Sequence, residues 1–174
     1  LYVISWFGVF RYTARVSYAT PFAPPYTPKV TCAITCYAEG QAVQNTVVSL
    51  LEQAYSGHIE IIALVDGVQR NQVTYQALKD LLPGISRYPK RTLIIIPKIQ
   101  RGGRVSSLNA GLSRATGDIL LALDGDTSFD NQMVQRASAH FQNENVVAVT
   151  GPMRVRNARA SIVTLLQSLE YMLS

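Results

Sequence analysis

The sequence predicts an α/β domain in which helices flank a mostly parallel β-sheet. Apolar runs typical of strands alternate along the chain with segments of helical period. Several of these runs are apolar at consecutive positions, as strands are when helices cover both faces of their sheet. The chain has 174 residues, of which 48% are hydrophobic and 16% charged, so it holds enough apolar material for the core of one ordinary domain.

Five apolar runs are predicted as strands. They include "VTCAITC", "IEIIALV" and "TLIII" in the first part of the chain, then "DILLALD" and "VVAVTG". Helical segments separate them, which is the pattern of strands joined by crossover helices and therefore favours a parallel sheet. The predicted strands cover residues 30–36, 59–65, 92–96, 118–124 and 146–151.

Four helices are predicted between the strands, over residues 41–55, 71–82, 104–115 and 131–142. Gly117 suits the turn after the third helix, and Asp130 can cap the fourth. The apolar face of the first helix is expected from Val43, Val47, Leu50, Leu51 and Ala54. The apolar stripe of the third is expected from Val105, Leu108, Leu112 and Ala115.

The two ends of the chain differ from its middle. Residues 1–19 open with "LYVISWFGVF" followed by Arg11 and Arg15, which predicts a hydrophobic, juxtamembrane segment; a helix buried against the domain is the alternative. Residues 20–28 are rich in proline and form a predicted linker. The domain itself is expected over residues 29–174. It ends inside an amphipathic helix, so we expect it to be incomplete at the C-terminus.

Charge and cysteine usage exclude some classes of function. The formal net charge is +5, and the Lys and Arg residues are scattered, so a nucleic-acid partner is not expected; an anionic ligand or a membrane surface fits better. Cys32 and Cys36 are four residues apart on a predicted strand, about 13 Å, which is too far for a disulfide. His58 and His140 lack zinc-ligand spacing to them.

Acidic residues follow several of the predicted strands. Asp66 ends the second strand, Asp124 ends the fourth, Asp126 comes two residues later, and Glu39 lies just past the first. Ligands of parallel α/β sheets bind beyond the carboxyl ends of the strands. The two aspartates around Gly125 offer hard oxygen ligands to Mg²⁺ or Mn²⁺, and such an ion neutralises a diphosphate.

Three other interpretations of "LDGDTSFD" can be weighed from the residues. An ordinary strand-to-helix turn uses the same residue types. A calcium-binding loop starting at Asp124 would need Gly and an acid where Phe129 and Gln135 stand, so that interpretation fails. A metal-dependent phosphatase of the haloacid-dehalogenase type also begins with D-x-D after an apolar strand, but there the motif follows the first strand.

Several motifs taken in order resemble family 2 glycosyltransferases of the membrane-bound polysaccharide-synthase type. "AITCYAEG" resembles the family's P-x-Y-N-E segment, and "IIALVDGVQRN" its aspartate-glycine loop. "GGRVSSLNAGLSRATGDILLALDGDT" is similar to its G-K-x-x-x-L-N-x-G stretch running into D-x-D. "VTGPMRVRN" and "LLQSLEY" resemble the next segment in poly-N-acetylglucosamine and hyaluronan-type synthases. Motifs in this order are more specific than any one of them.

The resemblance implies a GT-A-type (Rossmann-like) fold and a UDP-sugar donor, UDP-GlcNAc or UDP-glucose, bound with Mg²⁺ or Mn²⁺. It implies an inverting transfer to a growing β-linked polysaccharide by a membrane-associated protein whose catalytic domain faces the cytoplasm. Asp66 would contact the uridine, and Asp124 the donor. Asp126, with Asp124, would hold the metal. The implied donor-binding residues are Tyr37, Glu39, Asp66, Arg104, Asn109, Asp124 and Asp126.

The sequence also departs from the family pattern. Ala38 stands where the family usually has Asn, and Arg104 where it usually has Lys, which keeps the charge but changes its geometry. The family's base is an aspartate in a T-E-D-like motif followed by Q-x-x-R-W; neither occurs here, so the base is expected beyond Ser174. A nucleotide-sugar-binding module without turnover is therefore the main alternative, and the phosphatase a weaker one.

Overall fold

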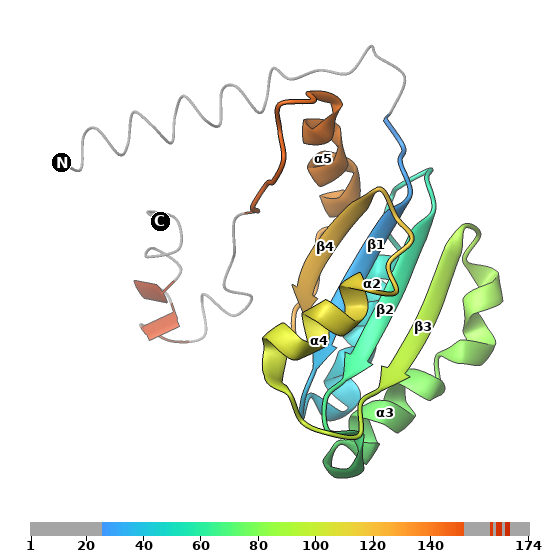
Figure 1. Cartoon of the computed structure of the whole chain (residues 1–174), viewed down its shortest axis with the longest axis vertical. Helices are drawn as coiled ribbons and strands as arrows, with labels where there is room; N and C mark the ends of the chain where they lie inside the picture. The colour runs from blue at the N-terminus through green and yellow to red at the C-terminus, as the bar shows by residue number, and fades with distance from the viewer. Residues whose placement is uncertain (1–25, 152–160, 162, 165, 168–174) are drawn as a thin grey trace. The chain divides into compact units, whose positions relative to one another are not determined.

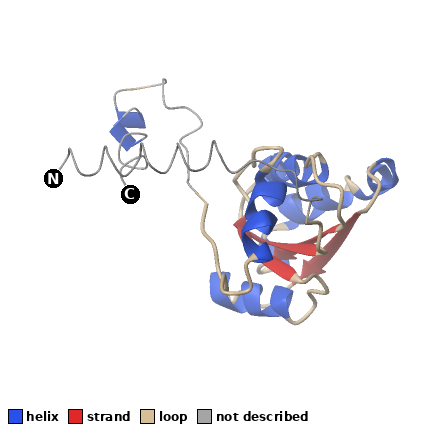
Figure 2. Ribbon diagram, turned by 90° about the horizontal axis from the view of Figure 1, so that it is seen from above, coloured by secondary structure: helices blue, strands red, loops and turns tan. Residues whose placement is uncertain are grey.

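The computed structural model describes residues 26–151, 161, 163–164 and 166–167. Residues 26–145 form one compact unit, and residues from 146 onward belong to a second unit, described separately below. The larger unit contains a four-stranded sheet with helices on both faces (Figures 1 and 2). The predicted segment 1–19 and residues 20–25 of the predicted linker 20–28 lie outside the described residues.

The four strands of the sheet are all parallel and lie in the order β3-β2-β1-β4. Register places Cys36 of β1 beside Val65 of β2, and Thr35 of β1 beside Asp124 of β4. The carboxyl ends of all four strands therefore meet at one edge of the sheet. The strands are β1 (Val30–Cys36), β2 (Ile59–Val65), β3 (Arg91–Pro97) and β4 (Ile119–Asp124).

Helices connect the strands as parallel crossovers require. The α-helices are α2 (Val43–Leu51), α3 (Gln72–Lys79), α4 (Gly103–Leu112) and α5 (Met133–Ala139). Short 3-10 helices cover Gly40–Ala42, Val68–Arg70, Leu82–Arg87 and His140–Gln142. In the view of Figure 1, α4 lies in front of the sheet, with α2 and α3 behind it.

Two apolar clusters, one on each face of the sheet, hold these layers together. Alternate strand residues point to opposite faces. On one face, Ile34 and Ile61 belong to the larger cluster together with Val47 and Leu50 of α2. On the other, Ala33, Ile62 and Leu64 form a smaller cluster against Leu108 and Ala115. The central strands β1 and β2 are thus covered on both faces, as their unbroken apolar runs predict.

The face that α4 presents to the sheet differs from the predicted stripe. Val105 and Leu112 are 73% and 58% exposed, whereas Ser107 and Gly111 are buried. A Cβ on Gly111 would lie 3.1 Å from Leu64 Cδ1 and 3.2 Å from Ala33 Cβ. The helix therefore packs closely on the sheet through its small residues. Of the predicted stripe, Leu108 and Ala115 do pack against the sheet, whereas Val105 and Leu112 do not.

The prediction of a fifth strand over residues 146–151 is wrong. These residues have no regular secondary structure, and Val147 is 90% exposed. Their apolar, β-branched composition suits a strand, but a strand also needs a hydrogen-bonded neighbour. Within the described residues, β4 pairs with β1 alone.

The predicted final helix falls largely outside the described residues. Residues 163–164 and 166–167 are helical, and Ser161 and Thr164 exchange hydrogen bonds through their hydroxyl groups. Within the described part of the chain, no helix is both long and apolar enough to cross a membrane. The other helices exist where predicted but are shorter; α2, for example, ends at Leu51 rather than at residue 55.

Candidate active site

A polar pocket of about 310 Å³ lies at the edge where the four strands end. Six of the seven predicted site residues line it; the exception is Asn109, which is exposed on α4. The parallel topology explains this convergence, because it brings together segments that follow different strands. The pocket is lined by Thr35, Cys36, Tyr37, Glu39, Asp66, Arg101, Gly103, Arg104, Ser107, Asp124, Gly125 and Asp126.

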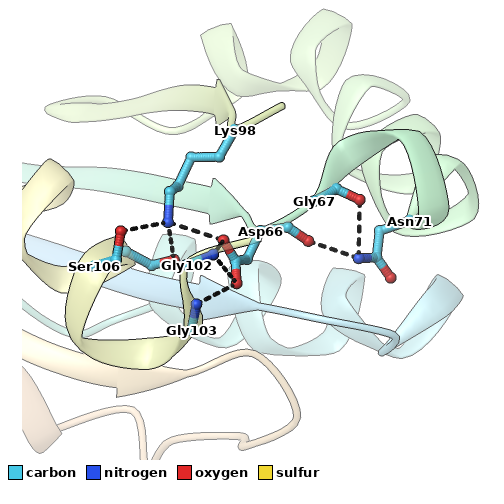
Figure 3. Close-up of polar contacts among 8 residues, drawn as sticks. Asp66, Gly67, Asn71, Lys98, Gly102, Gly103 and Ser106 are labelled. Atoms are coloured by element: carbon cyan, nitrogen blue, oxygen red, sulfur yellow. Dashed lines mark hydrogen bonds and ion pairs between the residues drawn. The ribbon is translucent and has the colours of Figure 1, made fainter. Parts of the chain in front are cut away.

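The carboxylate of Asp66, the residue that follows β2, accepts hydrogen bonds from Lys98, Gly102 and Gly103 (Figure 3). Its Oδ1 accepts from Lys98 Nζ at 2.8 Å and from the N–H of Gly102 at 3.0 Å. Its Oδ2 accepts from the N–H of Gly103 at 2.8 Å. Gly102 precedes α4 and has no side chain to cap it. The carboxylate of Asp66 therefore satisfies the free N–H groups at the start of that helix.

The environment of Asp66 keeps its carboxyl group ionised. Burial alone would raise its pKa, but the hydrogen bonds from Lys98 and from the N–H groups of Gly102 and Gly103 outweigh burial and lower the pKa below its ordinary value. Lys98 Nζ also donates to Ser106 Oγ at 3.1 Å and Ser107 Oγ at 3.0 Å. The ion pair thus joins the ends of β2 and β3 to the first turns of α4.

Arg104 and Asp124, both predicted to face the donor, form an ion pair in the structure. Arg104 Nε lies 2.9 Å from Asp124 Oδ1, and the side chains are 59% and 52% exposed. Asp124 also accepts from Thr35 Oγ1 at 3.3 Å. An exposed pair of this kind contributes about 0–1 kcal/mol to stability. Either partner can therefore separate at small cost and turn to a ligand.

Glu39 lies against the turn between the two aspartates. Its Oε1 accepts from the N–H of Tyr37 at 2.7 Å, whereas its Oε2 is buried and has no hydrogen-bond partner among the described residues. A Cβ on Gly125 would lie 3.2 Å from Glu39 Cδ and 3.0 Å from Thr35 O, so glycine allows this close approach. An unpartnered carboxylate oxygen at this place favours a cation or a hydroxyl group as neighbour.

Sequence reasoning missed two basic residues: Arg101, which lines the pocket, and Lys98, which forms an ion pair with the pocket residue Asp66. The guanidinium of Arg101 lies 3.9 Å from the centre of the Tyr37 ring, a cation–π contact. Lys98 follows the predicted third strand by two residues and so had to lie at the same edge as the acids. Examining which basic residues follow the strand ends could therefore have identified Lys98 from the sequence.

Ala38 adopts an unusual backbone conformation beside the pocket. Its φ is 70°, in the left-handed region, and its N–H donates to Asn71 Oδ1 at 2.9 Å. Asn and Gly adopt this region more readily than Ala does. The departure from the family's Asn therefore occurs where the backbone favours Asn.

Cys36, at the end of β1, also lines the pocket. Burial raises the pKa of its thiol, and the nearby carboxylate of Glu39 raises it further. The group is therefore a neutral thiol. The thiolate is the form that attacks electrophiles and binds metals, so Cys36 is not in its reactive form.

The profile of Glycosyl transferase family 2 matches residues 31–169, most of the chain and all of the pocket. The chain belongs to this family. It is 28% identical over 128 residues to an N-acetylglucosaminyltransferase of Azorhizobium caulinodans, covering 74% of this chain and 31% of that protein. It is 28% identical over 136 residues to a poly-beta-1,6-N-acetyl-D-glucosamine synthase of Staphylococcus aureus, covering 78% of this chain and 31% of that protein.

The family 2 chain therefore spans about a third of the length of these two relatives. Among solved structures it is similar to a mannosyltransferase from Pyrobaculum calidifontis in complex with GDP-Man and Mn²⁺. The TM-score is 0.60 at 20% identity, with 88% of this chain and 46% of that chain covered. The likeness confirms the predicted GT-A-type fold.

Proposed function

We propose that this chain carries the donor-binding part of a glycosyltransferase that uses a UDP-sugar and a divalent cation. The observation that carries the proposal is the convergence of Asp124, Asp126 and Arg104 with Tyr37 and Asp66 in one pocket at the carboxyl edge of a parallel sheet. Carboxylates for a cation and an arginine for a diphosphate are what such a donor needs. Membership of family 2 supports the same conclusion.

The residues of the pocket fit Mg²⁺ or Mn²⁺ with the help of the donor. The described residues contain no cluster of three or more His, Cys, Asp or Glu side chains able to hold a metal ion. Mg²⁺ is often held in proteins by one or two carboxylates together with substrate phosphates. Asp126 and Asp124 would supply these ligands, and the unpartnered Oε2 of Glu39 adds negative charge beside them. A bound cation would stabilise the charge that develops on the leaving diphosphate.

Each of the other pocket residues has a role that follows from its surroundings. Arg104, freed from Asp124, would pair with the diphosphate, because its guanidinium can donate two parallel hydrogen bonds. Tyr37, with its exposed ring, would pack on the nucleoside. The carboxylate of Asp66 would contact the uridine and would also keep its hydrogen bonds to the start of α4. We propose that Asn109 contributes to the sugar end of the site once the donor is bound.

The sugar, the acceptor and the location are further parts of the same proposal. The names of the two relatives favour UDP-GlcNAc as donor over UDP-glucose, and the second name favours a growing β-linked polysaccharide as acceptor. Transfer by inversion is part of the same proposal. The acceptor-side base is assigned to none of the pocket residues and would lie in the part of the relatives that this chain does not span. Residues 1–19 would attach the protein to a membrane, with the domain on the cytoplasmic side.

Calorimetric titration of the chain with UDP tests the donor site. We expect binding in the presence of Mn²⁺, at least tenfold weaker binding in EDTA, and weaker binding of GDP than of UDP. In Asp126→Asn the gain in affinity from Mn²⁺ should be lost, because one of two protein ligands has lost its charge. Asp80→Asn, an exposed carboxylate at the end of α3, is the matched control and should behave like the wild type.

Two results would contradict the proposal. One is UDP affinity that is the same with Mn²⁺ and with EDTA in the wild type. The other is an Asp126→Asn variant that is folded by circular dichroism and retains the full metal effect. Tighter binding of GDP than of UDP would keep the metal site and overturn the choice of nucleoside.

A further inference from the structure

Helix α2 presents a row of polar side chains to the segment that follows β4. We call Thr46, Ser49 and Gln53 the α2 polar row; the first two lie on α2, and Gln53 lies two residues past its end. Thr46 and Ser49 are three residues apart, so they lie on one side of the helix, and Gln53 follows four residues after Ser49. Thr46 and Gln53 are buried at 1% and 4% exposure. Buried polar groups are costly unless they are bonded, so their partners matter.

The partner of Thr46 is the glycine between the two aspartates. Thr46 Oγ1 donates to the carbonyl oxygen of Gly125 at 2.8 Å. The N–H of Gly125 donates in turn to the carbonyl oxygen of Thr35, at the end of β1, at 3.0 Å. Gly125 is therefore held from two sides, by the sheet through its nitrogen and by α2 through its oxygen.

This arrangement fixes the position of the backbone nitrogen and Cα of Asp126. The C=O of Gly125 and the N–H of Asp126 belong to one planar peptide group, so fixing the oxygen also fixes the nitrogen and Cα of Asp126. Strand β4 ends at Asp124, and the sheet ladder therefore does not hold Asp126. The hydrogen bond from the Thr46 hydroxyl holds the backbone there, one peptide group beyond the end of the sheet.

The rest of the α2 polar row holds the following residues in the same way. Ser49 Oγ accepts from the N–H of Phe129 at 3.2 Å. Gln53 Nε2 donates to the carbonyl oxygen of Asp130 at 2.7 Å, and Gln53 Oε1 accepts from the N–H of Val134 at 2.9 Å. The backbone from Gly125 to Val134 is thus bonded to this row at four points.

We propose that Thr46 is a positioning residue for the cation ligands. It acts through Gly125 and holds the Asp124–Asp126 turn in the geometry that the cation and the diphosphate require before they bind. The proposal rests on the proposed function, because it presumes a cation at this turn. Residues that orient metal ligands typically change metal affinity by about 10- to 100-fold when they are mutated. Loss of the Thr46 hydroxyl should act in that range.

A purely structural role makes a different prediction. Thr31 is equally buried at 0% exposure, and its Oγ1 donates to Glu60 Oε2 at 2.6 Å at the opposite end of β1. Thr31→Val and Thr46→Val both remove a buried hydroxyl group and keep the volume of the side chain. Both should lower the free energy of unfolding, but only Thr46→Val should change the affinity for the cation.

The experiment measures Mn²⁺ dissociation constants by electron paramagnetic resonance in the presence of saturating UDP, and UDP affinity in EDTA by calorimetry. We expect Thr46→Val to weaken Mn²⁺ binding by about tenfold or more, with UDP affinity in EDTA unchanged. Thr46→Ser keeps the donor and should bind Mn²⁺ within about threefold of the wild type. Should Thr46→Val not fold, Ser49→Ala, which frees the N–H of Phe129, takes its place with a smaller effect in the same direction.

The possible results separate the two proposals. If the wild type needs Mn²⁺ for tight UDP binding but Thr46→Val or its substitute has an unchanged Mn²⁺ constant, the positioning role is wrong and the donor site stands. The same holds if Thr31→Val weakens Mn²⁺ binding as much as Thr46→Val. If the wild type shows no effect of Mn²⁺ at all, the proposed function fails and the positioning role fails with it.

Discussion

Asp66 accepts a hydrogen bond from the N–H of Gly103 at 2.8 Å, so a carboxylate that follows one strand caps a helix that follows another. The bond connects the second and third crossovers of the fold and fixes the approach of α4 to the pocket. The same carboxylate is neutralised by Lys98. Asp66 therefore combines the role of a helix cap with a place in the donor pocket, and a change at this residue has consequences for both.

We predict that Asp66→Asn lowers the free energy of unfolding by about 2 kcal/mol at pH 7, the size expected for hydrogen bonds to a charged group. The effect should depend on pH. The folded-state pKa of Asp66 is lowered, so its contribution is present above the unfolded-state pKa and is lost as the pH falls through the folded-state value. Urea unfolding between pH 2.5 and 7 should show the difference between variant and wild type shrinking below about pH 4.

Glu60 provides the internal comparison for that experiment. Burial alone would raise its pKa, but hydrogen bonds from Thr116 and Thr31 lower it below its ordinary value. The Asp66→Asn variant should therefore keep part of the acid sensitivity of the wild type. A difference between the two proteins that stays constant down to pH 2.5 would show that the ionised form of Asp66 contributes nothing.

A second prediction concerns the left-handed backbone at Ala38. Gly adopts a φ of 70° without strain and Asn with little, so Ala38→Gly and Ala38→Asn should each raise the free energy of unfolding by about 0.5–1 kcal/mol. Urea denaturation measures this directly. Ala42, whose φ is −62°, is the control, and Ala42→Gly should lower stability. Equal destabilisation by glycine at both positions would contradict the assignment of strain to Ala38.

The sequence predicted the strands well because their apolar runs are unbroken and end at polar residues. The ranges 30–36 and 59–65 coincide with β1 and β2. Strand β3 is longer than predicted by one residue at each end, and β4 starts one residue later than predicted. The predicted fifth strand failed because its composition carries no information on a neighbour. The exposed Val105 and Leu112 show a similar limit, since Ser107 and Gly111, which are not large and apolar, are the buried residues of α4.

The candidate site was predictable to the extent that topology determines it. Acids at strand ends must gather at one edge of a parallel sheet, which is why Asp66 and Asp124 share a pocket. Contacts made by side chains of other elements were not predictable. Thr46 is the one polar side chain among the buried residues of α2, and its bond to Gly125 depends on the distance between α2 and the end of β4. Neither the amino-acid composition nor the hydrophobic period of the sequence predicts that distance.

The exposed ion pair between Arg104 and Asp124 leads to a third prediction. Arg104→Met should change the free energy of unfolding by less than about 0.5 kcal/mol, because surface pairs contribute little. It should weaken UDP binding by at least tenfold through loss of a charged hydrogen bond to the diphosphate. Arg104→Lys should fall between the two, since Lys keeps the charge without the two parallel donors. Calorimetry at 50 and 300 mM salt should show a smaller salt dependence in Arg104→Met than in the wild type. An equal salt dependence would place the diphosphate elsewhere.

The fourth prediction uses the close contact between Gly125 and the end of β1. A Cβ at this position would lie 3.0 Å from Thr35 O, 3.2 Å from Glu39 Cδ and 3.3 Å from Cys36 Sγ, so Gly125→Ala must displace the turn by a few tenths of an ångström. We expect a loss of about 1–3 kcal/mol in stability, as for other overpacked sites. The ratio of UDP affinity with Mn²⁺ to that in EDTA should fall at least tenfold, because the displaced turn carries both proposed ligands.

The control for this variant is Gly111→Ala, which is crowded to a similar degree, 3.1 Å from Leu64 Cδ1, but on the inner face of α4. It should lose comparable stability and keep the affinity ratio, because the turn after β4 is untouched. Both stabilities come from urea unfolding and both ratios from calorimetry on the same preparations. If Gly125→Ala and Gly111→Ala lower the ratio equally, the effect reflects general loosening of the domain. In that case the geometry of the Asp124–Asp126 turn would not be what the cation requires.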